Sequence, residues 1–287
     1  NKKKKNKTIK LGETLLPQIN KFSTDRNRTS PFAFVDNRFE FRMPGSSTSI
    51  AVCNTILNVA VANQFSEIAN VLEKSNNIYE DAQKLIIKLM EKHSRIIYNG
   101  NGYADEWCKE AEVRGLKNIK TAPEAIKAFT QEKNIELFEK YNIYTKKEIY
   151  SRYKIKLSKY CNRISLEANT MLKISESEIL PVCLDYSKQI VEKIIDLKKL
   201  QINFETEKQI LEKLRENIDE LYKNNEEVKT KLQEADVLQQ FEEKAEYYSK
   251  EIINNMYNLR KTVDNLEQIM PKNMWPMPTY SDIFLED

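Results

Sequence analysis

The feature that most constrains this chain is the spacing of its apolar residues, which recur three or four positions apart over most of its length. Between Phe204 and Met270 the spacing continues almost without a break. Steps of three and four residues place side chains on one face of an α-helix. Only 5 Gly and 8 Pro occur among 287 residues, so turns are few and helices are long. The sequence therefore predicts a mainly α (α+β) chain in which long helices pack side by side as a hairpin or bundle.

Charge and composition argue against several classes of protein. The net charge is +3, and acidic and basic residues are interspersed, which argues against a dedicated nucleic-acid or membrane-surface protein. No apolar stretch reaches the roughly 18 residues of a membrane span. The four cysteines are scattered and His93 is the only histidine, so we expect no zinc site. Scattered cysteines indicate a reducing compartment, the cytoplasm, where they serve as small core residues.

Helix breakers and capping residues divide the chain into predicted helices. Thr145-Lys-Lys-Glu148 is a capping box, and Pro181 predicts a kink or a new helix start close to it. The polar patch Lys223–Glu227 could hold a turn, although nothing there demands one. The last segment, Met274–Tyr280, is expected to dock as an irregular strap. The predicted helices are Ser49–Lys74, Ile78–Tyr98, Asp105–Gly115, Pro123–Phe129, Asn134–Tyr141, Thr145–Ser177, Pro181–Leu200 and Phe204–Met270.

The first 45 residues contain alternating segments that differ from the rest. Phe32–Val35 and Arg38–Met43, joined by Asp36-Asn37, predict a β-hairpin over residues 32–43, because Asp and Asn tolerate the positive φ of a two-residue turn. Alternation along a strand sends successive side chains to opposite faces. One face of the second strand is therefore expected to hold Arg38, Glu40 and Arg42, and the other Phe39, Phe41 and Met43.

This charged strand face has two interpretations. A carboxylate can hold a divalent metal, and guanidinium groups can neutralise phosphate oxygens or bind a substrate carboxylate, so Glu40 between Arg38 and Arg42, with Arg28 upstream, suits phosphoryl transfer. From the pattern alone, a solvated face with weak ion pairs is favoured. One carboxylate does not make a metal site, and its partners would come from elsewhere.

Other conspicuous residues have plainer interpretations. Asn99-Gly-Asn-Gly102 could cradle a phosphate through backbone N–H groups, but it lacks the lysine of a P-loop, so a turn between helices is favoured. We expect His93 to be an exposed helical residue. Trp107 and Trp275 are expected to be packing anchors.

Several segments resemble one known family. Asp25–Phe34 (Asp-Arg-Asn-Arg-Thr-Ser-Pro-Phe-Ala-Phe) and Phe39–Ser47 (Phe-Glu-Phe-Arg-Met-Pro-Gly-Ser-Ser) closely resemble the late catalytic-domain signature of type III glutamine synthetases. The similarity runs from about Leu11 to the end of the chain. Later segments resemble the same family in the same order: Asn99–Trp107, Ser151–Tyr153, Glu167–Met171, Ile179–Pro181 and Trp275–Asp282.

The resemblance implies an ATP-dependent glutamate–ammonia ligase. Such an enzyme makes γ-glutamyl phosphate from glutamate and ATP and then lets ammonia displace the phosphate, with Mg²⁺ or Mn²⁺ ions in the site. By resemblance, Glu40 is a metal ligand and Arg42 contacts glutamate and the transferred phosphate. Arg28 matches a contact to the ATP phosphates, and Arg38 lies near the nucleotide.

The resemblance also implies an organisation. Residues 1–145 would be the end of the catalytic domain, and 146–287 the C-terminal helical bundle domain. The family forms homo-oligomers of two stacked hexameric rings. Its β-grasp domain and most metal-binding strands precede the segment seen here. We therefore expect a fragment, a split-gene product or a degraded paralogue, inactive without a complementing N-terminal part.

The alternative function belongs to another class, a non-catalytic helical scaffold or interaction protein. The helical bulk of the chain and the missing metal ligands favour it. Binding of Mg²⁺ and an ATP analogue distinguishes the two.

Overall fold

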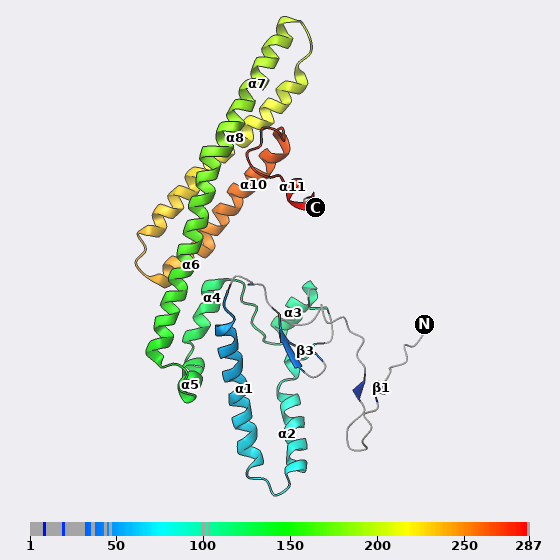
Figure 1. Cartoon of the computed structure of the whole chain (residues 1–287), viewed down its shortest axis with the longest axis vertical. Coiled ribbons are helices and arrows are strands. Elements are labelled where there is room, and N and C mark those ends of the chain that lie inside the picture. The colour runs from blue at the N-terminus through cyan, green and yellow to red at the C-terminus, as the bar shows by residue number, and fades with distance from the viewer. Residues whose placement is uncertain are drawn as a thin grey trace. The chain divides into compact units, whose positions relative to one another are not determined.

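A computed structural model describes residues 8–9, 19–20, 32–35, 38–42, 45, 48–98, 101–102 and 104–285 (Figure 1). The chain divides into two compact units, Asn1–Asn118 and Ile119–Asp287. Long helices dominate the described residues, which confirms the mainly α class. The predicted domain boundary between residues 145 and 146 stays a prediction.

Among its described residues, the first unit contains two short antiparallel strand pairs. β1 (Thr8–Ile9) pairs with β2 (Ile19–Asn20), a pairing that the sequence pattern did not predict. β3 (Phe32–Val35) pairs with β4 (Arg38–Phe41), so the predicted hairpin is confirmed, with its second strand ending at Phe41. In this register Ala33 is opposite Glu40, and Val35 is opposite Arg38. The turn residues 36–37 lie outside the described part.

The helices of the first unit follow the predicted order. α1 (Ala51–Leu72) and α2 (Ile78–Lys92) form a helical hairpin, followed by a 3₁₀ turn, η2 (Ser94–Ile96), and by α3 (Asp105–Val113). The predicted second helix ended at Tyr98, whereas α2 ends at Lys92 and the chain tightens into η2.

The second unit is a bundle of long helices with two π-helical turns. Its first part contains α4 (Ala122–Lys127), η3 (Ala128–Thr130) and α5 (Glu132–Lys140). The bundle itself consists of α6 (Lys146–Ile174), η4 (Ser175–Ile179), α7 (Leu180–Lys199), α8 (Glu205–Asp236), α9 (Phe241–Tyr247), η5 (Tyr248–Ile252) and α10 (Ile253–Ile269), and α11 (Tyr280–Leu285) ends the chain.

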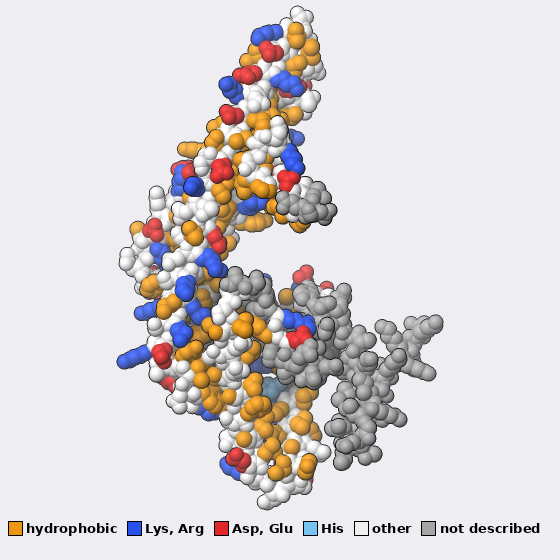
Figure 2. Space-filling view, in the orientation of Figure 1, with side chains coloured by type: hydrophobic (Ala, Val, Ile, Leu, Met, Phe, Trp, Pro, Cys, Tyr) orange, Lys and Arg blue, Asp and Glu red, His pale blue; other side chains and the backbone are white. Residues whose placement is uncertain are grey.

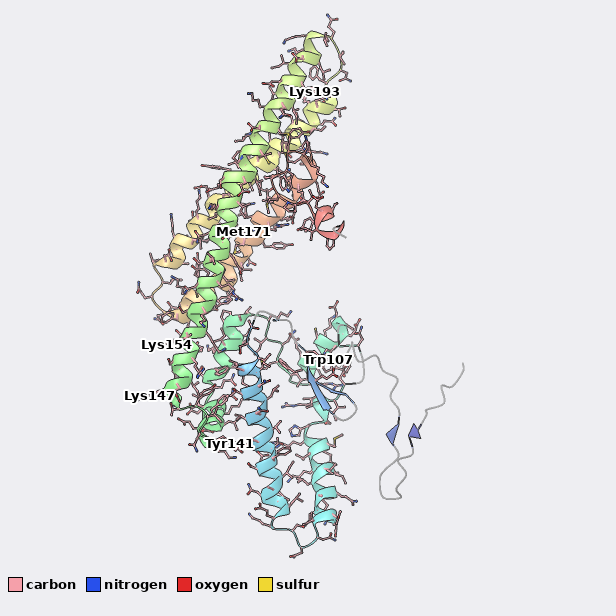
Figure 3. The ribbon with its side chains drawn as sticks, viewed as in Figure 1. Trp107, Tyr141, Lys147, Lys154, Met171 and Lys193 are labelled. Carbon is pink, nitrogen blue, oxygen red and sulfur yellow. The ribbon has the colours of Figure 1, made fainter. Side chains whose placement is uncertain are left out.

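The core of the second unit lies where α8 packs against α7 and α10. Apolar residues spaced by three or four point inward from α8, as the spacing predicted. Trp275 is buried against this core and is a packing anchor, as predicted. Lys193 marks the end of the bundle at which α7 passes into α8 (Figure 3), and its Nζ lies 3.1 Å from the carboxylate of Glu207 on α8. The buried apolar residues of α8 are Leu214, Ile218, Leu221, Val228, Leu232 and Ala235.

The structure bears out or decides three points of the prediction for the second unit. α6 and α7 follow one another through η4 without a break (Figure 1). Pro181 sits in the first turn of α7, where its missing N–H is tolerated. The patch Lys223–Glu227 lies in the middle of α8, and the chain reverses instead at residues 237–240. The strap Met274–Tyr280 is irregular as predicted up to Thr279, and α11 begins at its last residue, Tyr280.

The cysteines only partly serve as core residues. Cys161 and Cys183 are buried, as predicted, and Cys53 is half-buried. Cys108 is exposed on α3, so the expectation that it is a core residue was wrong. His93, expected to be exposed, is half-buried at the end of α2.

Candidate functional site

The candidate site centres on Glu40 of β4 and on Arg42, which directly follows the last residue of that strand. Glu40 and Arg42 are two positions apart on the chain, so alternation places both on the same side. Arg42 donates from Nη2 to Glu40 Oε2 over 2.7 Å and from Nε to the same oxygen over 3.1 Å. The side chains are 26% exposed for Glu40 and 30% for Arg42. The pair is therefore a charge-assisted contact at a partly desolvated position, and is stronger than a fully solvated pair.

The pair offers two kinds of chemistry. The carboxylate of Glu40 is a hard oxygen donor of the kind that Mg²⁺ and Mn²⁺ prefer. The planar guanidinium of Arg42 has five N–H donors in a fork whose geometry matches carboxylate and phosphate oxygens. Because a carboxylate has about four lone-pair positions, one carboxylate can accept from an arginine and also bind a cation.

A metal would need further ligands. Within the residues that the structure describes, no group of three or more His, Cys, Asp or Glu side chains could hold a metal ion. Glu40 fits the donor chemistry of Mg²⁺ or Mn²⁺ but supplies only one ligand. Companion carboxylates would come from outside the described residues.

The other predicted site residues are described less fully. Arg38 opens β4, two positions before Glu40, with its backbone opposite Val35. Arg28 lies outside the described residues. The structure therefore brings Glu40 and Arg42 together, and the roles of all four residues stay predictions.

A cluster of two aromatic rings and an arginine lies in the same unit, and the sequence pattern did not predict that these residues come together. Trp107, labelled in Figure 3, stacks on Tyr98 with ring centroids 3.9 Å apart and an interplanar angle of 21°. The guanidinium of Arg114 lies over both rings, 5.8 Å from the Tyr98 centroid and 5.4 Å from the Trp107 centroid. It donates to the backbone oxygen of Ile97 over 2.9 Å and pairs with Glu110. The cluster thus joins the segment after η2 to α3.

Local backbone chemistry explains the position of Arg114. Gly115 has φ +73°, the left-handed conformation that glycine adopts without strain. Its N–H bonds to Glu112 O, and the N–H of Leu116 bonds to Ala111 O, over 2.9 and 2.8 Å. This is a Schellman motif, which ends α3 and places Arg114 at its C-cap, directly after Val113. Trp107 alone was recognisable in the sequence, as a large anchor.

The chain is similar to known glutamine synthetases. Residues 81–198 match the family model described as the glutamine synthetase C-terminal domain. A type-3 glutamine synthetase of Dictyostelium discoideum is 32% identical over 282 residues, which is 95% of this chain and 38% of that protein. Glutamine synthetases of Bacteroides fragilis (strain YCH46) and Butyrivibrio fibrisolvens are 28% and 32% identical over 96% and 92% of this chain, and over 39% and 38% of their own lengths.

These matches confirm that the chain resembles the glutamine synthetase family. Within the family, the resemblance to the C-terminal part of the type III enzymes is confirmed. The chain spans about two fifths of the length of the curated relatives it matches. Among the described residues, none of the helices combines the length and the apolar character that crossing a bilayer requires.

Proposed function

We propose that this chain contributes to an ATP-dependent glutamate–ammonia ligase, and that it acts together with the part of the enzyme that precedes the aligned segment in the relatives. The observation that carries the proposal is the Glu40–Arg42 pair at the end of β4. Similarity to glutamine synthetases over nearly the whole chain supports it. In this proposal the protein is cytoplasmic and forms the family's homo-oligomer of two stacked hexameric rings.

The proposed reaction has two steps. A carboxylate oxygen of glutamate attacks the γ-phosphorus of ATP, giving γ-glutamyl phosphate and ADP. Ammonia then attacks the γ-carbonyl carbon, phosphate leaves, and a proton is released as glutamine forms. A bound Mg²⁺ or Mn²⁺ supplies Lewis-acid stabilisation of the phosphoryl oxygens.

The proposed roles follow from the charge of each residue. Glu40 would hold the metal through its carboxylate oxygens. Arg42 would bind the glutamate carboxylate and the transferred phosphoryl group, because its fork matches both. Arg28 and Arg38 would neutralise the ATP phosphates. These contacts orient the two substrates and stabilise the charge that develops during phosphoryl transfer.

Reconstitution tests the proposal. The full chain would be co-expressed with the part of the Dictyostelium relative that precedes its aligned segment, and phosphate release that depends on glutamate and ammonia would be measured with Mg²⁺ and ATP. We expect turnover, and we expect Glu40→Gln and Arg42→Lys each to lower it roughly 100-fold or more, as for the loss of a charged transition-state contact.

A matched ion pair serves as the control. Arg215 donates to Asp219 over 2.9 Å on the surface of α8, so Arg215→Lys and Asp219→Asn should leave turnover unchanged. A complex that forms but neither turns over nor binds Mg²⁺ and an ATP analogue in calorimetry would indicate the non-catalytic scaffold instead.

A further inference from the structure

The helical hairpin of α1 and α2 exposes large apolar side chains that the proposed chemistry does not use. α1 contains one charged residue, Glu67, among its 22 residues, and Val59 is its one fully buried residue. Fourteen of its residues are apolar and seven are polar but uncharged, so α1 lacks the charged face that a solvent-exposed helix normally carries. The sequence of α1 is therefore that of a core helix, while its surface lies largely open.

The open surface continues on α2. Phe65 on α1 is 67% exposed, and Ile86 and Met90 on α2 are 60% and 56% exposed. Tyr79, Ile86 and Met90 are seven and four positions apart, so they share one face of α2. Figure 2 shows hydrophobic side chains gathered over this hairpin on the face in view. A single exposed apolar residue is ordinary, whereas a group of this kind indicates an interaction surface.

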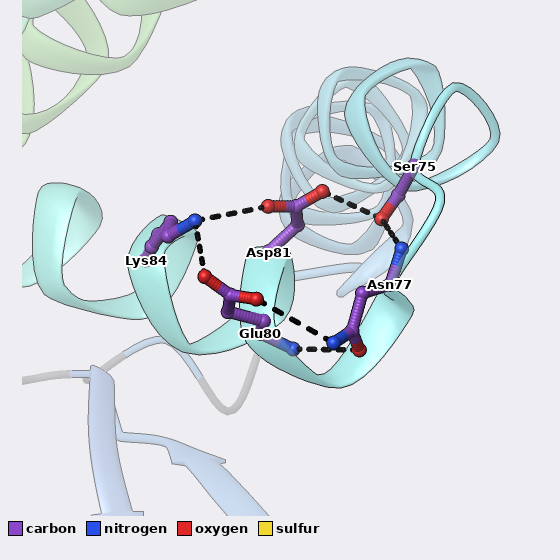
Figure 4. Close-up of polar contacts among 5 residues, drawn as sticks. All are labelled: Ser75, Asn77, Glu80, Asp81 and Lys84. Atoms are coloured by element: carbon purple, nitrogen blue, oxygen red, sulfur yellow. Dashed lines mark hydrogen bonds and ion pairs between the residues drawn. The ribbon is translucent and has the colours of Figure 1, made fainter.

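Polar contacts at the tip hold the two helices as a hairpin (Figure 4). Ser75 donates from Oγ to Asp81 over 2.6 Å and accepts from the N–H of Asn77 over 3.0 Å. The side chain of Asn77 caps α2 by accepting from the N–H of Glu80. Lys84 pairs with Glu80 over 2.7 Å and with Asp81 over 3.6 Å. These contacts fix the turn, and the remaining charged residues of α2, Lys88, Glu91 and Lys92, lie on a different face of the helix from Tyr79, Ile86 and Met90.

Two observations identify what covers this surface. The surface is apolar and nearly uncharged, so its partner is a folded apolar protein surface. The chain spans 38% to 39% of its relatives, each of which has a larger part outside the aligned segment. Glu40 and Arg42 lie just before α1 in the same compact unit.

We propose that the exposed apolar surface of α1 and α2 packs against the part of a glutamine synthetase that precedes the aligned segment in the relatives. The identity of this partner rests on the proposed function. Packing against α1 and α2 holds that part in a fixed position on the compact unit that also contains the Glu40–Arg42 pair. A second copy of this chain is the competing occupant.

The experiment measures complex formation and not activity. The full 287-residue chain would be co-purified with the preceding part of the Dictyostelium relative, and the dissociation constant measured by sedimentation. Ile86→Lys combined with Met90→Lys places two charges on the surface, so we expect the affinity to fall at least about 100-fold, as for buried interface anchors. Both positions are exposed in this chain, so the variant should fold, which circular dichroism verifies.

A control variant carries the same type of change in the other compact unit. Leu166 on α6 is 69% exposed, and Leu166→Lys should change the affinity less than threefold. The proposal is overturned if the double variant binds as tightly as the natural chain. It is also overturned if the chain alone forms a dimer that the double variant dissociates.

The result separates docking from catalysis. If the natural chain forms the complex without ligase turnover and the double variant does not form it, the docking surface is supported and the proposed function is contradicted. Turnover by a complex that tolerates the double variant contradicts the docking surface and leaves the function standing.

Discussion

Asn224 on α8 donates a hydrogen bond from Nδ2 to the hydroxyl of Thr262 on α10, 2.9 Å away, and both side chains are buried. Aliphatic residues of α8 such as Leu221 and Val228 lie on either side of this contact along the helix. Apolar contacts are non-directional and tolerate sliding, whereas one buried polar pair has a fixed geometry. The bond therefore defines how α8 and α10 align.

Breaking this bond on one side should destabilise the bundle. Thr262→Val keeps the shape but leaves the Asn224 amide buried without its acceptor, so we expect the free energy of unfolding to fall by about 1–3 kcal/mol. The double variant Asn224→Leu, Thr262→Val removes both polar groups and should recover most of the loss. Urea unfolding of the three proteins measures this, and a double variant that is less stable than Thr262→Val would contradict it.

The neighbouring Asn225 should behave in the opposite way. Its side chain is buried, and neither amide atom has a hydrogen-bond partner among the described residues. Asn225→Leu removes the cost of an unsatisfied buried amide, so we expect the free energy of unfolding to rise by about 1–3 kcal/mol. Asn224→Leu, the same change one position earlier, is the matched control and should bring no gain. A loss of stability in Asn225→Leu would show that its amide is satisfied by an ordered water.

Local patterns predicted most elements because they are set by neighbouring residues. Thr145 accepts from the N–H of Glu148, and the Glu148 carboxylate accepts from the N–H of Thr145 over 2.8 Å, so the predicted capping box is confirmed. The alternation around Glu40 predicted its shared face with Arg42. Both depend on residues within three positions of each other.

Features set by tertiary packing could not be predicted in this way. The apolar spacing runs through Leu238 without a glycine or proline, yet the chain reverses there so that α8 can pack on α10. Pro181 predicted a kink or a new helix start, and α7 does start at Leu180, but nothing in the sequence marked the π-helical turn η4 that joins it to α6. Arg114 and Trp107 contact Tyr98 only once α3 has folded back on the segment after η2, so no short sequence motif identifies this cluster.

The C-terminal helix α11 should undock in acid. The ion pair with Lys272, followed by hydrogen bonds from the side chain and backbone of Thr279, lowers the pKa of Asp282 from 3.8 to about 2. A lowered folded-state pKa means that the contribution to stability is present above the unfolded pKa and is lost as the pH falls toward the folded one. The window is therefore about pH 4 down to about pH 2.

Amide NMR shifts of Asp282 and Ile283 would follow this transition. Asp282→Asn should abolish it, while the amides of α8 report any global unfolding. A midpoint at the ordinary value for aspartate would contradict the prediction, because it would mean that Lys272 and Thr279 do not hold the carboxylate in solution.

The four thiols should differ strongly in reactivity. Burial raises the pKa of Cys183 to about 11 and also raises the pKa of Cys161, so thiolate is scarce at both sites at pH 8. Cys108 is exposed on α3 and should react first with a thiol reagent, followed by the half-buried Cys53. Cys108→Ser should remove the fast phase alone. Labelling of Cys183 in the native protein at the rate of Cys108 would contradict this order.

Replacing Arg114 tests whether its stacked contacts stabilise the first unit. Arg114→Lys keeps the charge but loses the planar group that lies over Tyr98 and Trp107 while donating to Ile97 O. We expect the free energy of unfolding of this unit to fall by about 1–2 kcal/mol, from one backbone hydrogen bond and a weakened cation–π contact. Trp107 fluorescence, recorded in a Trp275→Phe background during urea unfolding, measures it. Arg95→Lys, an exposed change in the same unit, should have little effect. Equal stability of the natural chain, Arg114→Lys and Arg95→Lys would mean that the Tyr98–Trp107 stack does not depend on Arg114.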